Sequence, residues 1–319
     1  MKVSILLPVY NAAHTIQETL DSIFNQTYTD YEIIIINDGS TDGSEEIILQ
    51  NKDSRIHYYS NPENKGLIYT LNQGIDLCQG EYIVRIDADD IMLPTRIEKQ
   101  LEYMDKNPQI AASGSAVWNF DGIHKDRLYI PPLQPEKMHY RILLGSTVPH
   151  PAAIIRKSVL DRHNIRFNPD YIHAEDYKFW YDLLQYGDLA NLKEPLIKYR
   201  HSSTQVSSKH KQTQLAISAQ LRREMITKLL QKQGLNYPAS YSLDKISELS
   251  KVLPNTVQYS TLLFLFVMSL PHYNLKTFIQ FIRSGIYLRK GFSYKYSGAI
   301  LLKMINLNSF PDFNLNLPR

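Results

Sequence analysis

The chain has 319 residues, of which 43% are hydrophobic and 21% charged, and it contains one cysteine, Cys78. This is ordinary globular composition, so a wholly disordered or collagen-like chain is excluded. A chain of this length can bury a sizeable core, so its fold needs no disulfide or bound metal for stability. One cysteine excludes an intrachain disulfide framework, argues against a cysteine-based zinc site and suits a reducing compartment.

Charge is distributed unevenly along the chain, although its net value is only +3. Residues 1–200 hold 20 Lys and Arg against 28 Asp and Glu, a net charge of −8. Residues 201–319 hold 15 against 4, a net charge of +11. The two parts are therefore expected to meet different partners.

The first 120 residues alternate between strand-like and helix-like patterns. The segment YEIIII at 31–36 is apolar on both faces, as in parallel strands that helices cover on both sides. Strands are expected at 3–9, 31–36, 55–60, 81–86 and 110–120, and helices at 15–24, 45–50, 67–78 and 94–105. This order predicts an α/β fold with a Rossmann-like, mostly parallel sheet. Ligands of such sheets bind at the carboxyl ends of the strands.

The rest of the chain is less regular at first and then helical. Between residues 121 and 200 we expect a helix at 175–186, ended by Gly187, and from residue 209 a helical, basic region. The most apolar run, 257–270, has 14 residues. A membrane-spanning helix needs roughly 20, so the run predicts a buried or interfacial helix. No signal-peptide pattern opens the chain.

Three carboxylates in four residues, Asp87, Asp89 and Asp90, follow the expected strand at 81–86. Such acids repel one another unless a cation or solvent lies between them. Mg²⁺ and Mn²⁺ prefer carboxylate oxygens and bridge to substrate phosphates. Aspartates also favour turns and helix caps, so a metal site and a turn remain two interpretations of this pattern.

Asp38 comes directly after the strand at 31–36 and has two interpretations as well. An acid at this position binds a polar edge of a nucleotide, or it forms an Asx turn. The chain has neither a dinucleotide-binding glycine loop nor a P-loop. If phosphates bind here, a metal must therefore neutralise much of their charge.

Glu175 and Asp176 open the expected helix at 175–186. Acids in a first turn gain about 0.3–1 kcal/mol from the helix dipole, or one of them acts as a general base toward an acceptor hydroxyl. Trp180, one turn further, lines the same pocket or belongs to the core. His150 is an acceptor-side residue or a structural hydrogen bonder. For Arg200 and His201 the two interpretations are a contact with a diphosphate, by charge or metal ligation, and a structural hydrogen bond.

Together these segments resemble glycosyltransferase family 2, the inverting nucleotide-sugar glycosyltransferases with the GT-A fold. The resemblance is to small bacterial members that build surface polysaccharides, and it covers roughly residues 1–208. It rests on five elements in the expected order: VSILLPVYN at 3–11, INDGSTD at 36–42, NKGL at 64–67, GEYI at 80–83 leading into DADD at 87–90, and AED at 174–176 with Trp180.

The resemblance implies how the donor is held. The nucleobase, expected to be uracil, lies against Asp38 and the segment 8–11, and Asp87 contacts the ribose or the diphosphate. Asp89 holds the Mn²⁺ or Mg²⁺ that bridges the donor diphosphate. The donor-binding residues implied are Pro8, Val9, Tyr10, Asn11, Asp38, Lys65, Asp87 and Ala88.

The resemblance also implies how the acceptor reacts. Asp176, with Glu175 beside it, deprotonates the acceptor hydroxyl, which attacks the anomeric carbon in line and inverts it. Trp180 and His150 are expected on the acceptor side. His201 is assigned to the metal, but related sequences often have Tyr-Arg-x-His, and here the histidine comes one residue early.

The sequence thus predicts metal-dependent, inverting transfer from a nucleotide sugar, expected to be a UDP-sugar, to a glycan or lipid-linked glycan. The products would be capsule, O-antigen or other bacterial surface polysaccharide, made in the cytoplasm. One alternative is a non-catalytic sugar-nucleotide-binding or scaffold subunit. Another is an aspartyl-phosphate phosphatase, which carries its Asp-x-Asp near the chain start, whereas Asp87 lies far from it.

The region 209–319 interleaves basic and aromatic residues, as in FIQFIR at 278–283 and YLRKGF at 287–292. Basic amphipathic helices with aromatics lie on anionic membrane surfaces, here the inner face of the cytoplasmic membrane. A helical subdomain with a solvated basic face is the alternative. No nucleic-acid recognition motif accompanies the charge, so no nucleic-acid partner is expected.

Overall fold

The structure is a computed structural model that describes residues 2–201, 210–237, 242–268 and 275–289. The chain divides into two compact units. Unit 1 holds residues 1–142 and 146–214, and unit 2 holds residues 143–145 and 215–319.

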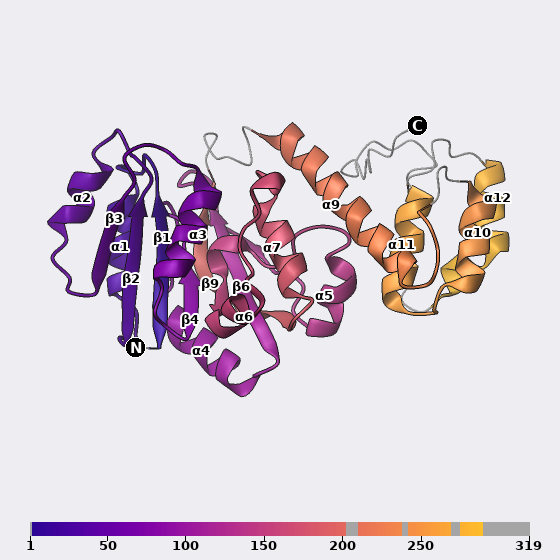
Figure 1. The fold of residues 1–319 in the computed structure, drawn as a ribbon, viewed down its shortest axis with the longest axis horizontal. Helices are drawn as coiled ribbons and strands as arrows, with labels where there is room; N and C mark the ends of the chain where they lie inside the picture. The colour runs from indigo at the N-terminus through magenta and orange to yellow at the C-terminus, as the bar shows by residue number, and fades with distance from the viewer. Residues whose placement is uncertain (1, 202–209, 238–241, 269–274, 290–319) are drawn as a thin grey trace. The chain divides into compact units, whose positions relative to one another are not determined.

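Unit 1 is built on a nine-stranded mixed sheet (Figure 1). Its strands are β1 (Val3–Val9), β2 (Tyr31–Asn37), β3 (Ile56–Ser60), β4 (Tyr82–Arg85), β5 (Ile91–Met92), β6 (Ile110–Phe120), β7 (Arg127–Tyr129), β8 (Ile154–Arg156) and β9 (Asp188–Arg200). Their order is β3-β2-β1-β4-β8-β6-β9-β5, with β7 paired to β6.

The helices of unit 1 follow the strands in the α/β manner. They are α1 (Ile16–Phe24), α2 (Ser44–Gln50), α3 (Leu67–Leu77), α4 (Arg96–Lys106), α5 (Pro135–Arg141), α6 (Lys157–His163) and α7 (Glu175–Leu183). Short 3₁₀ turns occupy His150–Ala152 and Pro169–Tyr171.

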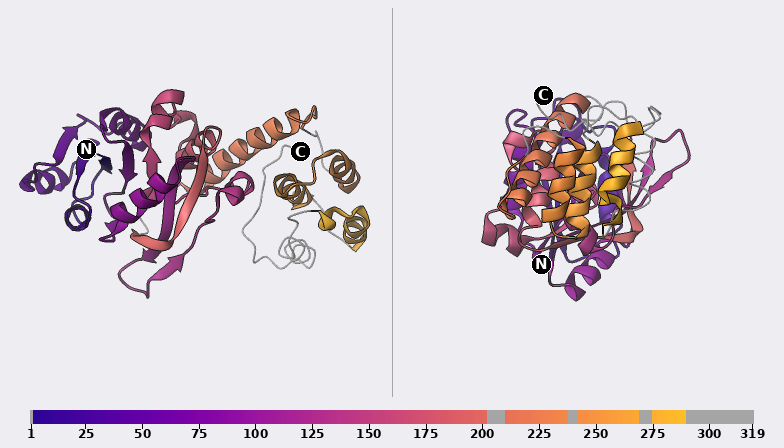
Figure 2. Two further views of the ribbon diagram at one scale, coloured as in Figure 1. Left: turned by 90° about the horizontal axis from the view of Figure 1, so that it is seen from below. Right: turned by 90° about the vertical axis from the view of Figure 1, so that its right-hand side faces the viewer.

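The described part of unit 2 is helical. Helix α9 (Lys211–Gln231) starts in unit 1 and continues into unit 2, followed by α10 (Leu243–Val252), α11 (Val257–Met268), α12 (Leu275–Ser284) and a 3₁₀ turn at Ile286–Leu288. Helices α10, α11 and α12 pack side by side (Figure 2). Residues 262–267 of α11 are all buried, in agreement with the buried helix expected there. In the part of the chain that the structure describes, no helix has the length and apolarity to span a membrane.

The core of unit 1 follows from the apolar strands. Every residue of β1 and β2 is buried, and α1 covers them with Ile16, Leu20 and Ile23, which recur at helical spacing on one face. Helix α3 approaches β1 closely at Gly74, where a Cβ would lie 2.1 Å from Leu6 Cδ1. A side chain at position 74 would therefore push α3 off the sheet.

The predicted α/β fold is confirmed, and the elements expected up to residue 120 are present within one or two residues of the expected bounds. Strands β1, β2, β3 and β4 pair in parallel, as expected, and β6 pairs in parallel with β9. The remaining pairings, β4–β8, β6–β8, β6–β7 and β5–β9, are antiparallel. The sheet is therefore mixed rather than mostly parallel in its second half. Helix α7 ends at Leu183, three residues before the expected end.

Candidate functional site

The carboxyl ends of β1, β2 and β4 meet at one edge of the sheet because the three strands are parallel neighbours. The segment after β1 is held by the loop after β2: Asp38 N–H donates to Val9 O at 2.8 Å, and Asn11 N–H donates to Ser40 Oγ at 3.0 Å. The hydroxyl of Thr15 donates to Ala88 O at 2.9 Å. These contacts bring the predicted donor-binding segments 8–11, 38 and 87–88 to the same edge.

Asp38 fixes a neighbouring loop with its own carboxylate. It is 3% exposed and accepts hydrogen bonds from Asn61 Nδ2 (2.8 Å), Lys65 N (3.0 Å) and Gly66 N (2.8 Å). The loop lies so close that a Cβ on Gly39, whose φ is +68°, would be 2.5 Å from the Glu63 carbonyl carbon. Asp38 thus shapes the edge at which a nucleobase is expected.

The other predicted donor-side residues at this edge differ in exposure. Pro8 and Val9 are buried at the end of β1, whereas the Tyr10 side chain is 50% exposed. Asn11 has a φ of +49° and accepts a hydrogen bond from Thr41 N–H at 2.8 Å. The Lys65 ammonium forms an ion pair with Glu63. Tyr10 therefore presents a large exposed face at this edge.

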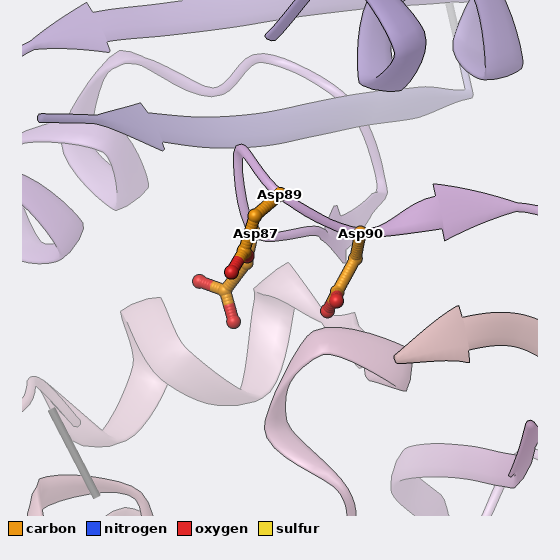
Figure 3. A group of neighbouring side chains, drawn as sticks. All are labelled: Asp87, Asp89 and Asp90. Carbon is orange, nitrogen blue, oxygen red and sulfur yellow. The ribbon is translucent and has the colours of Figure 1, made fainter. Parts of the chain in front are cut away.

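Asp87, Asp89 and Asp90 form an acidic cluster in which each residue offers a carboxylate oxygen within 4.8 Å of the others. Figure 3 shows the carboxylates of Asp87 and Asp89 side by side, with that of Asp90 further along the loop. Burial, and then the charge of Asp87, raises the pKa of Asp89 to about 6. Burial also raises the pKa of Asp90, whose Oδ1 accepts Arg200 N–H at 2.8 Å. Crowded carboxylates of this kind fit a hard divalent cation, which would relieve their repulsion.

A buried arginine stands beside this cluster. Arg85, on β4, is 3% exposed and donates to both carboxylate oxygens of Asp87. Its positive charge lowers the pKa of Asp89, Asp90, Glu175 and Asp176 against the effect of burial. The sequence reasoning missed Arg85. A charge inside the otherwise apolar strand YIVRI was the available signal, since buried charges are paired or functional.

Glu175 and Asp176 lie in the first turn of α7, and both are half-buried. Burial, and then the charge of Asp176, raises the pKa of Glu175 to about 7. Burial raises the pKa of Asp176 too, although Ser146 Oγ donates to its Oδ2 at 3.0 Å. Two neighbouring acids with raised pKa values, that of Glu175 near neutrality, suit proton transfer at physiological pH. Since Arg85 acts on this pair and on the acidic cluster, the two groups share one electrostatic environment.

The two predicted acceptor-side residues lie against each other. Trp180 has no exposed surface, and its ring contacts that of His150 edge-on, with centroids 5.9 Å apart. Burial holds the pKa of His150 well below its usual 6.5, so the imidazole is neutral. Trp180 is therefore part of the core, and His150 is the half-buried member of the pair.

His201 forms its hydrogen bond outside the acidic cluster in this structure. Its Nε2 is 2.8 Å from Asn119 Oδ1, and its ring meets that of Tyr199 edge-on. The group of potential metal ligands among the described residues contains the three aspartates and no histidine. Arg200 contacts the acidic loop instead, because its Nε donates to Asp89 O at 2.7 Å.

Comparison with known proteins identifies the family. The family model described as Glycosyl transferase family 2 matches residues 4–163. An uncharacterized glycosyltransferase of Haemophilus influenzae is 36% identical over 316 residues, 95% of this chain and 96% of that protein. The Escherichia coli protein WfgD, a UDP-Glc:alpha-D-GlcNAc-diphosphoundecaprenol beta-1,3-glucosyltransferase, is 31% identical over 65% of this chain and 79% of its own.

A solved structure shares the fold. The crystal structure of S. aureus TarS in complex with UDP-GlcNAc superimposes with a TM-score of 0.58, covering 93% of this chain and 92% of that one at 14% identity. This likeness shows the GT-A fold. The chain therefore belongs to glycosyl transferase family 2 and is a glycosyltransferase with a GT-A fold.

Proposed function

We propose that the protein transfers a sugar from a UDP-sugar to a hydroxyl of a glycan or lipid-linked glycan, with inversion and with the help of a divalent metal. Two relatives support the substrate class: WfgD acts with UDP-Glc on GlcNAc-diphosphoundecaprenol, and the Erwinia amylovora protein AmsE is an amylovoran biosynthesis glycosyltransferase, 30% identical over 69% of this chain. TarS, of the same fold, has been crystallised with UDP and with UDP-GlcNAc. The product would then be a bacterial surface polysaccharide.

The observation that carries the proposal is that one buried arginine, Arg85, lowers the pKa values of two separate acidic groups. The cluster of Asp87, Asp89 and Asp90 suits a metal-bound diphosphate, and Glu175 with Asp176 suits proton removal from a hydroxyl. Arg85 influences both groups. A donor site and a proton acceptor in one environment are what a direct displacement requires.

The donor would lie along the edge formed by the ends of β1, β2 and β4. In this proposal the nucleobase meets Asp38 and segment 8–11, with the exposed face of Tyr10 available for it and with Lys65 and Ala88 alongside. Asp87, held by Arg85, faces the ribose or diphosphate. Asp89, with its two acidic neighbours, would hold Mn²⁺ or Mg²⁺, which supplies neutralising charge for the departing diphosphate.

On the acceptor side, the proposed base is Asp176. Its carboxylate takes the proton of the attacking hydroxyl, and Glu175, with its raised pKa, stabilises or relays that proton. Neutral His150 is the proposed hydrogen-bonding group for the acceptor, backed by the buried Trp180 ring. In this proposal His201 becomes a metal ligand when donor binding breaks its hydrogen bond to Asn119 and moves its ring toward the acidic loop.

We also propose that the two regions of the chain have different roles. Residues 1–208 carry the transferase chemistry, and the basic region 209–319 meets an anionic membrane surface at the inner face of the cytoplasmic membrane. The net charge of +11 over residues 201–319 supports this, because each basic residue near an anionic surface contributes about 1 kcal/mol. Flotation of the full chain with phosphatidylglycerol vesicles at low salt tests it, and absence from the vesicle fraction would contradict it.

The transfer itself is tested with a panel of radiolabelled UDP-sugars, Mn²⁺ and an undecaprenyl-diphosphate-linked sugar. We expect one donor to yield product whose new anomeric configuration is opposite to that of the donor, as NMR would show. The Asp89→Ala variant should give no product. Donor binding without any turnover in the native protein would instead favour the sugar-nucleotide-binding or scaffold role.

A further inference from the structure

The loop that leads into the proposed catalytic pair is held from outside by the start of α9. His173, two residues before Glu175, stacks on His210 with ring centroids 4.1 Å apart and planes 10° from parallel. Gln214 Nε2 donates to the backbone carbonyl of His173 at 2.9 Å. His210 precedes α9 directly, and Gln214 lies in its first turn. All of these residues belong to unit 1.

His173 is held in a conformation that needs support. Its φ is +66°, in the left-handed region that residues with a Cβ rarely adopt. Such a residue persists where surrounding contacts over-determine it. Here the ring contact with His210 and the hydrogen bond from Gln214 act on the same residue, one on its side chain and one on its backbone.

This conformation bears on the catalytic pair through the backbone. The backbone of His173 lowers the pKa of the Glu175 carboxyl against the effect of burial, so its placement favours the ionised form. His173 is also the last residue before Ala174, which caps α7 without a side-chain hydrogen bond of its own. The entry of the chain into α7 therefore depends on His173, and the position of the Glu175 and Asp176 carboxylates depends on that entry.

We propose that His210 and Gln214 are positioning residues for the transfer reaction: they hold His173 in its left-handed conformation and so fix the Glu175–Asp176 pair for proton transfer from the acceptor. This inference rests on the proposed function of that pair. Neither residue contacts the acidic cluster in the structure, and their effect is expected on turnover rather than on donor binding.

The variants that test this are Gln214→Ala, His210→Ala and His173→Asn. Asparagine tolerates the left-handed conformation, so His173→Asn removes the ring while keeping the backbone. His210→Phe keeps a ring that can stack on His173, so it should behave like the native protein. Gln220→Ala is the matched control on the same helix, because Gln220 is exposed and bonds to Glu224 within α9. His163→Ala is the matched control for a stacked histidine, since His163 stacks on Tyr186, just beyond the other end of α7.

The first readout needs no ligand. Amide hydrogen exchange of the full chain should become at least several-fold faster in the segment 172–180 for Gln214→Ala and His210→Ala. The increase should be smaller for His173→Asn, which keeps the backbone conformation and the hydrogen bond from Gln214. Exchange should remain native in both controls and in His210→Phe. Unchanged exchange in this segment in all three variants would overturn the proposal.

The second readout is kinetic. With a UDP-sugar that the native protein turns over, kcat should fall about tenfold in His210→Ala and Gln214→Ala, while the Kd for UDP with Mn²⁺ stays unchanged. Added to Asp176→Asn, the same substitutions should lower the residual rate no further, because residues acting through one group are not additive. Full additivity, or a loss of UDP affinity, would contradict positioning.

The two hypotheses fail in different ways. If Asp176→Asn keeps native activity, the proposed role of the catalytic pair is wrong. If Asp176→Asn is inactive but His210→Ala and Gln214→Ala keep native kcat, only the positioning role is wrong.

Discussion

Arg85 donates two hydrogen bonds to the Asp87 carboxylate, from Nη1 to Oδ2 at 2.6 Å and from Nη2 to Oδ1. The arginine is almost completely buried, on the central strand β4, where a cation needs a partner. A second hydrogen bond holds the end of strand β4: the Arg96 guanidinium donates to Arg85 O at 2.7 Å. The first aspartate of the cluster is therefore fixed in place before any donor binds.

Removing the charge of Arg85 should shift the pH dependence of transfer. Because the positive charge of Arg85 lowers the pKa of the proposed base Asp176, Arg85→Gln should raise that pKa. A base works only when deprotonated, so activity is lost as pH falls through the pKa, and the acid limb should move about one unit upward. Arg85→Lys should show a smaller shift. The measurement is the pH profile of kcat/KM.

Arg55→Gln is the control for Arg85→Gln, because Arg55 also pairs with an aspartate two residues away, Asp53, but lies outside the site. Circular dichroism should show that each variant is folded. An unchanged acid limb in folded Arg85→Gln would mean that Arg85 does not act on the catalytic pair.

Asp176→Asn should abolish most of the transfer while leaving the donor site intact. Asparagine is isosteric but accepts no proton, and general-base catalysis contributes about 10²–10⁴-fold to rate. We expect kcat to fall by that factor, with the affinity for UDP and Mn²⁺ measured by calorimetry unchanged. Asp182→Asn, on the same helix and paired with Lys178, is the control. Native kcat in Asp176→Asn would assign the base elsewhere.

Glu175→Gln should stabilise the fold at alkaline pH. The pKa of Glu175 is raised from 4.5 to about 7 in the folded state. Between these values the folded chain keeps a proton that the unfolded chain has lost, so this carboxyl lowers stability as pH rises. Replacing it should raise the free energy of unfolding on the order of 1–3 kcal/mol at pH 8 and little at pH 4.5.

Urea unfolding at the two pH values measures this effect. The control is Glu102→Gln, because Lys106 lowers the pKa of Glu102 and no gain at pH 8 is expected from its replacement. An equal gain from Glu175→Gln at both pH values would show that its carboxyl is not the source of the pH dependence.

Asp38→Ala should loosen the edge at which the nucleobase is expected. Its carboxylate accepts three hydrogen bonds from the loop 61–66, and two of the donors are backbone N–H groups. Leaving such groups unpaired costs about 2–4 kcal/mol in total, which urea unfolding would detect. The exposed Asp30→Ala should change stability by less than about 0.5 kcal/mol. A loss no larger than that of Asp30→Ala would exclude Asp38 as the anchor of this loop.

The first 120 residues of the fold could be predicted from sequence because their strands are apolar on both faces and their helices have one apolar face. The later elements carry weaker signals. Strand β8 has three residues, and β9 joins the sheet through a parallel pairing with β6 interrupted by register shifts. Nothing in a local pattern reveals such long-range pairings.

The candidate site was predictable where residues follow a strand end or open a helix. Asp38, Asp87 and Asp89 lie at the ends of β2 and β4, as parallel strands require. Arg85 was missed since its role depends on burial beside carboxylates from other segments. The contact of His173 with His210 could not be predicted from the sequence either, because it joins residues 37 positions apart that share no motif.

The measurement that tests the account most directly is the thermal stability of the purified protein with UDP-, GDP- and dTDP-sugars, each with Mn²⁺ or with chelator. A ligand at 100 times its Kd adds about 2.7 kcal/mol of stability, which raises Tm by several degrees. We predict a rise with a UDP-sugar only when Mn²⁺ is present, and no rise for Asp89→Asn. An unchanged Tm with every nucleotide sugar in the presence of Mn²⁺, or an equal rise in Asp89→Asn, would contradict the proposed metal-dependent donor site.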